Sequence, residues 1–181
     1  GSGVDYANAN TGDLGGIDYV DAISGVDALV SQGFADPKRL GVGGYSYGGY
    51  LSSWSITQTT RFKAAVSGGI LADLISFYGT TDIPQYLTIH LGEPPFPEQS
   101  LAWQRSPLKH ASKVKTPVLF YVGDSDQRTP PGQVHQMHRA VEDAGVTTLK
   151  VIYSGEGHGF VDRNNQLDLM QRMLAWYGRY L

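Results

Sequence analysis

The sequence feature that most constrains the fold is the pentapeptide Gly44-Tyr45-Ser46-Tyr47-Gly48. It follows a short apolar run, RLGV, and precedes LSSWSITQT, a segment that can form a helix. A serine at such a strand-to-helix turn adopts a strained backbone conformation, and its side chain projects above the sheet. Glycines two residues to either side leave room where the strand and the helix approach each other. The pattern therefore predicts that Ser46 is a nucleophile on an α/β scaffold.

Two other interpretations of this segment are weaker. The serine could be incidental to a glycine-rich turn between a strand and a helix. Dinucleotide binding fits poorly, because GVGGYSYGG lacks the G-x-G-x-x-G order and no acidic residue ends a following strand to hold a ribose.

The rest of the chain alternates predicted helices and strands. Apolar residues at helical spacing predict a helix over about 17–31, a second helix ending near Gly145, and an amphipathic helix that closes the chain. Between them lie the short apolar runs FKAAVSGG, TPVLFYVGD and LKVIYSG. Strands that are apolar on both faces and bounded by helices predict a mostly parallel sheet of about four strands, covered by helices on both faces.

The segment 70–115 departs from this alternation. It is irregular, contains the proline cluster EPPFPE and is rich in aromatic residues. We expect a lid or excursion within a single domain that spans residues 1–181. Its aromatic residues could cover the core or form the wall of a substrate pocket, and the substrate-binding candidates among them are Phe77, Tyr78 and Trp103.

A serine hydroxyl needs a base, and the base needs an orienting carboxylate, so both should follow later strands in the order Ser, Asp, His. Asp126 lies just after TPVLFYVGD, and His158 lies just after LKVIYSG, flanked by glycines. Asp124 is the rival carboxylate, but it follows the strand immediately and can instead satisfy backbone groups of the turn. The predicted catalytic residues are therefore Ser46, Asp126 and His158.

The other histidines are weaker candidates. His135 and His138 are neighbours on one helical face and could hold a metal, but the sequence suggests no third ligand, so a solvated face is favoured. His90 and His110 lie in the irregular region. We predict neither a metal nor a cofactor.

Charge and composition restrict the partner. The 181 residues carry 14 Lys and Arg against 17 Asp and Glu, a formal charge of -3 with no long run of either sign, which disfavours nucleic acid and anionic lipid. A peptide or small acyl substrate is favoured instead. No apolar run approaches the length of a membrane span, so we expect a soluble chain. The absence of cysteine leaves the compartment open and is compatible with the cytoplasm.

These residues resemble the catalytic domain of the prolyl oligopeptidase family, within it the acylaminoacyl-peptidase-like branch. The similarity runs from DLGGIDYVDAISGVDALVSQGFADPKRLGVGGYSYGGYLSSW through SFYGTTDI to VGDSDQRTPPGQ and GEGHGF, which is nearly the whole chain. The resemblance implies that Ser46 is the nucleophile, Asp126 the orienter and His158 the base, and that the Tyr47 amide donates to the oxyanion. The family often shows Val where this chain has Thr129.

The resemblance also implies missing parts, since the family's α/β-hydrolase fold has further N-terminal strands, one of which leads to a second oxyanion donor. We therefore expect a partial domain whose strand near 39–44 has a free edge, covered by the segment 1–16, by a complementing N-terminal segment or by a second copy. The alternatives to a peptidase are a carboxylesterase on the same residues and a catalytically silent fragment that acts by complementation or dimerisation.

Overall fold

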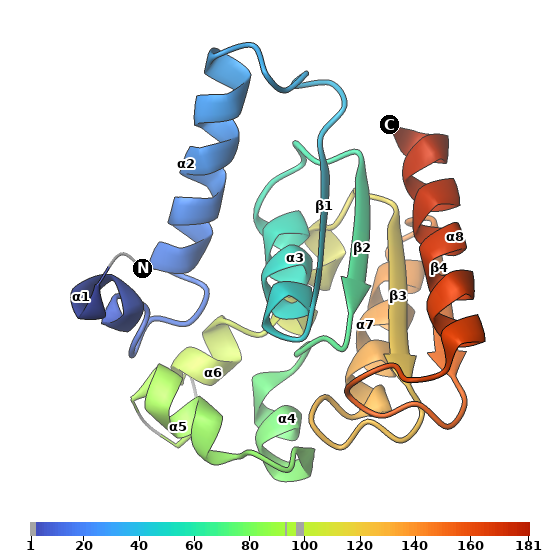
Figure 1. Cartoon of the computed structure of the whole chain (residues 1–181). Helices are drawn as coiled ribbons and strands as arrows, with labels where there is room; N and C mark the ends of the chain where they lie inside the picture. Colours follow the sequence, from blue (N-terminus) through green and yellow to red (C-terminus); the bar gives the residue numbers. More distant parts are fainter. Residues whose placement is uncertain (1–2, 93, 97–99) are drawn as a thin grey trace.

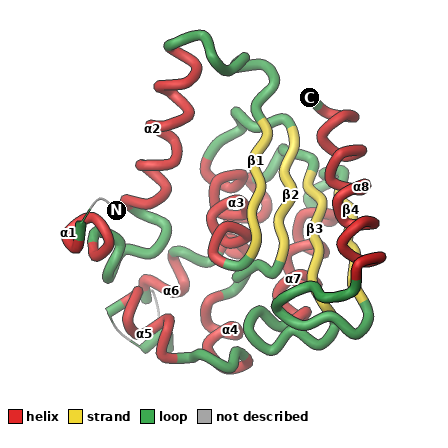
Figure 2. Tube along the Cα trace, viewed as in Figure 1, coloured by secondary structure: helices red, strands yellow, loops and turns green. Residues whose placement is uncertain are grey.

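A computed structural model describes residues 3–92, 94–96 and 100–181 of the chain. Its centre is a four-stranded sheet in the order β1-β2-β3-β4, in which every neighbouring pair is parallel. Figure 2 shows the strands side by side. Their bounds are β1 Gly41–Tyr45, β2 Ala64–Gly68, β3 Val118–Gly123 and β4 Thr148–Tyr153. All four strands point the same way, so the loops that follow them gather at one end of the sheet.

Helices cover both faces of this sheet (Figure 1), as the sequence predicts. On one face lie α3, α7 and a 3-10 helix, and on the other lies the C-terminal helix α8. Their bounds are α3 Tyr47–Gln58, η1 Pro107–Lys113, α7 Pro131–Asp143 and α8 Arg163–Tyr180. The predicted α/β class with about four parallel strands is therefore confirmed.

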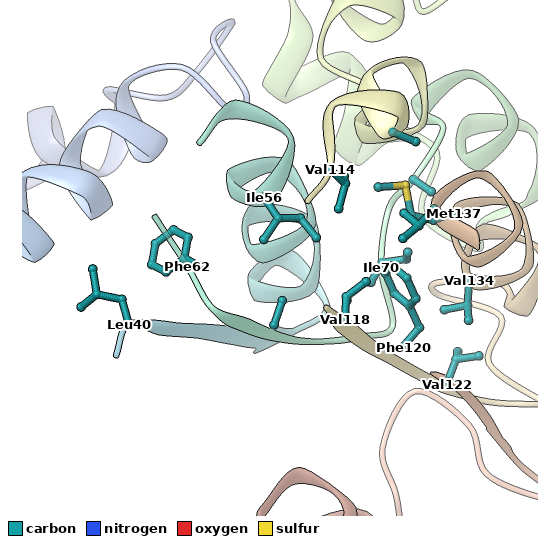
Figure 3. Close-up of a cluster of buried hydrophobic side chains, with 14 residues drawn as sticks. Leu40, Ile56, Phe62, Ile70, Val114, Val118, Phe120, Val122, Val134 and Met137 are labelled. Atoms are coloured by element: carbon teal, nitrogen blue, oxygen red, sulfur yellow. The ribbon is translucent and has the colours of Figure 1, made fainter. Parts of the chain in front are cut away.

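The two faces of the sheet carry separate apolar clusters because alternate strand residues point to opposite sides. Figure 3 shows the cluster between the sheet, α3 and α7, where Phe120 and Val118 of β3 meet Ile56 of α3 and Met137 of α7. On the opposite face, Leu119 and other strand residues pack against α8 in a cluster with Val66, Tyr121, Tyr153 and Trp176. This two-sided burial fixes the strand ends that carry the polar residues described below.

The described residues of the segment 70–115 form three short helices before η1. The helices are α4 Leu74–Thr80, α5 Gln85–Leu91 and α6 Leu101–Gln104, and they lie beyond the carboxyl end of the sheet (Figure 1). Asp73 caps α4 by accepting hydrogen bonds from the backbone N–H groups of Ile75 and Ser76. Ala111 of η1 and Val114 just after it are buried in the core, so the end of the segment belongs to the body of the domain. That the remainder acts as a lid stays a prediction.

The N-terminal part consists of α1 Val4–Asn8 and α2 Ile17–Ser31. Helix α2 matches the predicted range, yet none of its side chains is fully buried. Leu14, in the turn before it, is fully buried against Tyr50 and Trp54 of α3. The described residues 3–16 form no strand beside β1, which lies at the end of the four-stranded sheet.

Candidate active site

Ser46 lies at the turn between β1 and α3 in an unusual backbone conformation. Its φ is 60° and its ψ is -119°, and among the described residues it is the one non-glycine residue with a positive φ. Such a conformation costs of order 1–3 kcal/mol and persists only where the surroundings enforce it. Here the Ser46 N–H donates to the Gly68 carbonyl (3.0 Å), and the Ser46 carbonyl accepts from the Tyr50 N–H (2.9 Å).

The glycines around Ser46 are needed for the close approach that the pattern predicts, but at one different position. A Cβ at Gly44 would overlap the backbone of Gly48, and one at Gly49 would overlap the carbonyl oxygen of Gly68. A Cβ at Gly48 itself would meet nothing within 4 Å. The close approach therefore requires glycine at 44 and 49, whereas the sequence pattern had pointed to 44 and 48.

The three predicted catalytic side chains form one hydrogen-bonded chain. His158 Nε2 lies 2.9 Å from Ser46 Oγ, and His158 Nδ1 lies 2.9 Å from Asp126 Oδ2 and 3.2 Å from Asp126 Oδ1. The Ser46 and His158 side chains come from positions 112 residues apart in the sequence. Asp126 is 3% exposed, whereas the His158 side chain is 29% exposed and so open to a ligand on one side.

Backbone amides fix the orientation of the Asp126 carboxylate. Its Oδ1 accepts hydrogen bonds from the N–H groups of Arg128 (2.9 Å) and Thr129 (2.8 Å). Its Oδ2 accepts from the hydroxyls of Thr129 (2.8 Å) and Tyr45 (3.3 Å). A carboxylate held by this many donors has little freedom to rotate.

Asp124, the rival carboxylate, joins the loop after β3 to the loop after β4. It accepts hydrogen bonds from the Ser125 hydroxyl (2.9 Å), the Ser154 hydroxyl (3.0 Å) and the Gly155 N–H (2.9 Å). These hydrogen bonds lower the pKa of Asp124, with that from Ser125 the largest cause. The structure thus brings Asp126, and not Asp124, within hydrogen-bond distance of His158.

Glu156 is a second carboxylate in the loop of His158. It is 1% exposed and accepts hydrogen bonds from the Val161 N–H (2.8 Å), the Asp162 N–H (3.0 Å) and the Asn165 side-chain amide (2.9 Å). These donors, the Asn165 amide first, lower the pKa of Glu156. The loop on both sides of His158 is therefore tied to the first turn of α8.

A cavity of about 220 Å³ adjoins Ser46 and is mainly apolar. Its walls come from the turn at Ser46, the α4 region and the loop of Asp126, and its lining residues are Ser46, Tyr47, Leu71, Phe77, Ile83, Tyr86, Arg128 and Thr129. Of the three substrate-binding candidates, only Phe77 is among these residues. The Tyr78 ring packs edge-on against Phe96, and Trp103 is 44% exposed with the Lys109 ammonium over its ring.

An ion pair lies at the wall of this cavity. Arg128 donates from Nε to Asp82 Oδ1 (2.6 Å) and from Nη2 to Asp82 Oδ2 (3.2 Å), and this contact lowers the pKa of Asp82. The Thr81 hydroxyl also donates to the Arg128 carbonyl (2.7 Å). The segment after α4 is thus fastened to the loop that carries Asp126.

Tyr47 is the first residue of α3, so its N–H has no acceptor within its own helix. An anion beside Ser46 can therefore be bound by this amide at the positive end of the helix. The Tyr47 side chain points elsewhere, and its hydroxyl donates to the carboxylate of Asp18.

The other histidines lie away from this arrangement. His135 and His138 lie on α7 near Lys150. Burial, and to a lesser extent the charge of Lys150, lowers the pKa of both imidazoles, and the same positive charge disfavours a metal cation there. Within the described ranges no group of three or more His, Cys, Asp or Glu side chains could hold a metal ion. His110 bonds the Gln104 carbonyl (2.9 Å), and His90 packs on Tyr86.

The sequence reasoning missed several residues of the site. Thr129 and Glu156 contact the side chain or the loop of a predicted catalytic residue, and Ile83 and Tyr86 line the cavity. The sequence offers one signal at Glu156, its place between two glycines, but its burial is visible only in the structure. No sequence signal distinguishes Ile83 and Tyr86 from their apolar neighbours.

A parallel α/β sheet with a strained serine after one strand, and with an aspartate and a histidine hydrogen-bonded in series after two later strands, defines the α/β-hydrolase class. The chain belongs to the prolyl oligopeptidase family, whose sequence profile matches residues 1–181. The resemblance inferred from the motifs is thereby confirmed.

Similar proteins include peptidases from several organisms. Over the whole of this chain, its sequence is 37% identical to the uncharacterized peptidase YuxL of Bacillus subtilis. Over 99% of this chain, it is 32% identical to the acylamino-acid-releasing enzyme of Arabidopsis thaliana. It superposes with a TM-score of 0.93 and 36% identity on a puromycin-hydrolyzing peptidase of Mycobacterium tuberculosis, over 97% of this chain and 27% of that one. The chain spans 28% and 25% of the lengths of the first two relatives.

No helix in the described part of the chain is long and apolar enough to cross a bilayer.

Proposed function

We propose that this chain carries the catalytic residues of a serine peptidase that cleaves peptide bonds through an acyl-enzyme on Ser46. The observation that carries the proposal is the series of two 2.9 Å contacts, from Ser46 Oγ to His158 Nε2 and from His158 Nδ1 to Asp126 Oδ2. A hydroxyl is a poor nucleophile at neutral pH unless a base accepts its proton, and here the base and its orienting carboxylate lie within hydrogen-bond distance.

The reaction follows from these contacts. Ser46 Oγ attacks the scissile carbonyl carbon while its proton passes to His158 Nε2, and the Tyr47 N–H donates to the resulting oxyanion. The C–N bond then breaks, and the leaving amine takes the proton from His158. Water then attacks the acyl carbon while its proton passes to His158 Nε2. The ester C–O bond breaks as Ser46 Oγ takes that proton back, which releases the acid and restores free Ser46. Asp126 holds Nδ1–H throughout and stabilises the imidazolium.

The cavity beside Ser46 supports a preference at the acyl side of the scissile bond. Leu71, Phe77 and Ile83 give it an apolar wall, and about 220 Å³ accommodates an apolar side chain. The name of the Arabidopsis relative favours an N-acylated amino acid in that position. The proposed substrate is therefore a peptide whose acyl-side residue is apolar and N-acylated.

A fluorophosphonate probe followed by peptide mapping tests the proposed nucleophile. We expect stoichiometric label on Ser46, with loss of label in His158→Ala. Absence of label on a folded sample would instead favour the silent-fragment alternative. The ratio of kcat/KM on an N-acetyl-aminoacyl anilide to that on the matching ester separates peptidase from esterase, because a carboxylesterase accepts the ester alone.

A further inference from the structure

The Thr129 hydroxyl lies where the imidazole of His158 meets its carboxylate. Thr129 Oγ1 donates to Asp126 Oδ2 at 2.8 Å and lies 3.3 Å from His158 Nδ1. The residue is 1% exposed, so the hydroxyl does not exchange this contact for water. The Asp126 oxygen that binds His158 is therefore shared with a second, buried donor.

Orienting the carboxylate does not require this hydroxyl. Asp126 Oδ1 is already held by the backbone N–H groups of Arg128 (2.9 Å) and Thr129 (2.8 Å). Those two bonds form with any residue at position 129 except proline. The side chain of Thr129 adds a hydrogen bond to Asp126 Oδ2, the oxygen that binds His158 Nδ1. This hydrogen bond reduces the negative charge that Oδ2 presents to the imidazole.

We propose that Thr129 is a positioning residue that weakens the hold of Asp126 on protonated His158 and so sets the pH at which His158 changes its protonation state. The inference rests on the proposed function, in which His158 must both accept the Ser46 proton and release it to the leaving amine. A carboxylate oxygen that already accepts a hydroxyl hydrogen bond attracts an imidazolium less strongly. Thr129 thereby favours proton release at the expense of basicity.

The surroundings of His158 contain other groups that act on its charge. The Tyr45 ring lies 5.1 Å from the imidazole, centroid to centroid, and its hydroxyl donates to Asp126 Oδ2 at 3.3 Å. Among the described residues, Asp82 after α4 acts electrostatically on His158, and Arg128 after β3 acts on Asp126. Tyr121 of β3 and Glu156 of the histidine's own loop act on Tyr45. All of them are unchanged in the substitutions at position 129 proposed next.

Thr129→Val removes the hydroxyl and nearly keeps the side-chain shape, while Thr129→Ser keeps the hydroxyl and removes the methyl. The titration of the His158 ring, followed by NMR, measures the effect without any turnover. We expect the midpoint to move upward by about 0.5 pH unit in Thr129→Val and to stay at the parent value in Thr129→Ser. An unchanged midpoint in Thr129→Val, a downward shift, or an equal shift in Thr129→Ser would overturn the proposal.

Tyr45→Phe supplies a second variant in case Thr129→Val does not fold. It removes the longer of the two hydroxyl contacts to Asp126 Oδ2, so the His158 midpoint should move in the same direction by a smaller amount. If the midpoint shifts in neither variant, the proposal is overturned. The pH dependence of the fluorophosphonate labelling rate should shift in parallel. If Ser46 takes no label in any variant while the NMR midpoints move as expected, the proposed function fails and the role of Thr129 stands.

Discussion

The Glu156 carboxylate accepts a hydrogen bond of 2.8 Å from the backbone N–H of Val161, and this contact closes the loop that carries His158. The backbone carbonyl of Glu156 accepts from the Ser125 N–H (3.0 Å), one residue before Asp126. One residue therefore holds the histidine loop against both α8 and the aspartate loop. We expect the distance from His158 to Asp126 to depend on this junction.

Glu156→Gln should lower the rate of Ser46 labelling several-fold, because an amide cannot accept from all three donors without turning its own N–H₂ toward one of them. The folded-state pKa of Glu156 is lowered from its ordinary value of 4.5. Its stabilising contribution is therefore fully present above about pH 4.5 and is lost as the pH falls through the folded pKa. Thermal melts of the parent and of Glu156→Gln should differ at pH 7 and converge as the pH falls through the folded pKa of Glu156.

Glu142→Gln is the matched control for that experiment. Glu142 lies on α7, is itself exposed and makes a 3.7 Å ion pair with the exposed Arg139. Its replacement should change neither the labelling rate nor the acid dependence of the melt. An equal response of both variants would mean that Glu156 acts through net charge and not through its hydrogen bonds.

Ser46→Ala should lower peptide hydrolysis by a factor of at least about 10⁴, because members of a catalytic triad act as a unit. Its melting temperature should stay near that of the parent protein, since alanine keeps the strained φ of 60°. Ser46→Gly should be equally inactive but more stable than Ser46→Ala by about 1 kcal/mol, because glycine tolerates a positive φ. Steady-state kinetics and denaturant melts check both statements.

Ile83→Phe should fill part of the cavity beside Ser46. We expect kcat/KM to fall by about 10-fold for an acyl-side phenylalanine and to change little for an acyl-side alanine, since the smaller side chain needs less space. Trp103→Ala is the control, because Trp103 is not among the residues that line this cavity. If Trp103→Ala discriminates between the two substrates and Ile83→Phe does not, the pocket has been assigned to the wrong residues.

Tyr177→Phe should lower the free energy of unfolding by about 1 kcal/mol. The Tyr177 hydroxyl donates to the Val42 carbonyl at 2.9 Å and so ties α8 to the end strand β1. Tyr180→Phe is the control. The Tyr180 ring lies 5.0 Å from the Trp176 ring of the same helix, and within residues 3–92, 94–96 and 100–181 its hydroxyl makes no hydrogen bond to β1, so this variant should unfold like the parent. Urea titration of the three proteins measures the difference.

The outer edge of β1 should support association with another chain. Because no described strand pairs with this edge, its backbone groups are available to a second copy or to a complementing segment. Sedimentation velocity should show self-association that grows with concentration. A monomer at all concentrations would contradict this prediction without affecting the proposed chemistry.

The sequence by itself determined the α/β class and the alternation of the main strands and helices, and it singled out Ser46, Asp126 and His158, which the structure places in one hydrogen-bonded series. These follow from local signals, because apolar periodicity reports which faces are buried and a glycine-flanked serine after a strand reports a tight turn. Sequence position alone also favours Asp126 over Asp124 as the carboxylate that orients His158, since a carboxylate directly after a strand tends to accept hydrogen bonds from the turn.

Only the tertiary structure decided which side chains surround those three residues. Thr129, Glu156 and Ile83 have ordinary neighbours in the sequence, and their roles arise from loops that meet across separate strand ends. Tyr78 and Trp103 do not line the cavity with Phe77, because the direction of a side chain on a short helix depends on what that helix packs against. Local pattern carries no information on that packing, which is set by contacts between segments far apart in the chain.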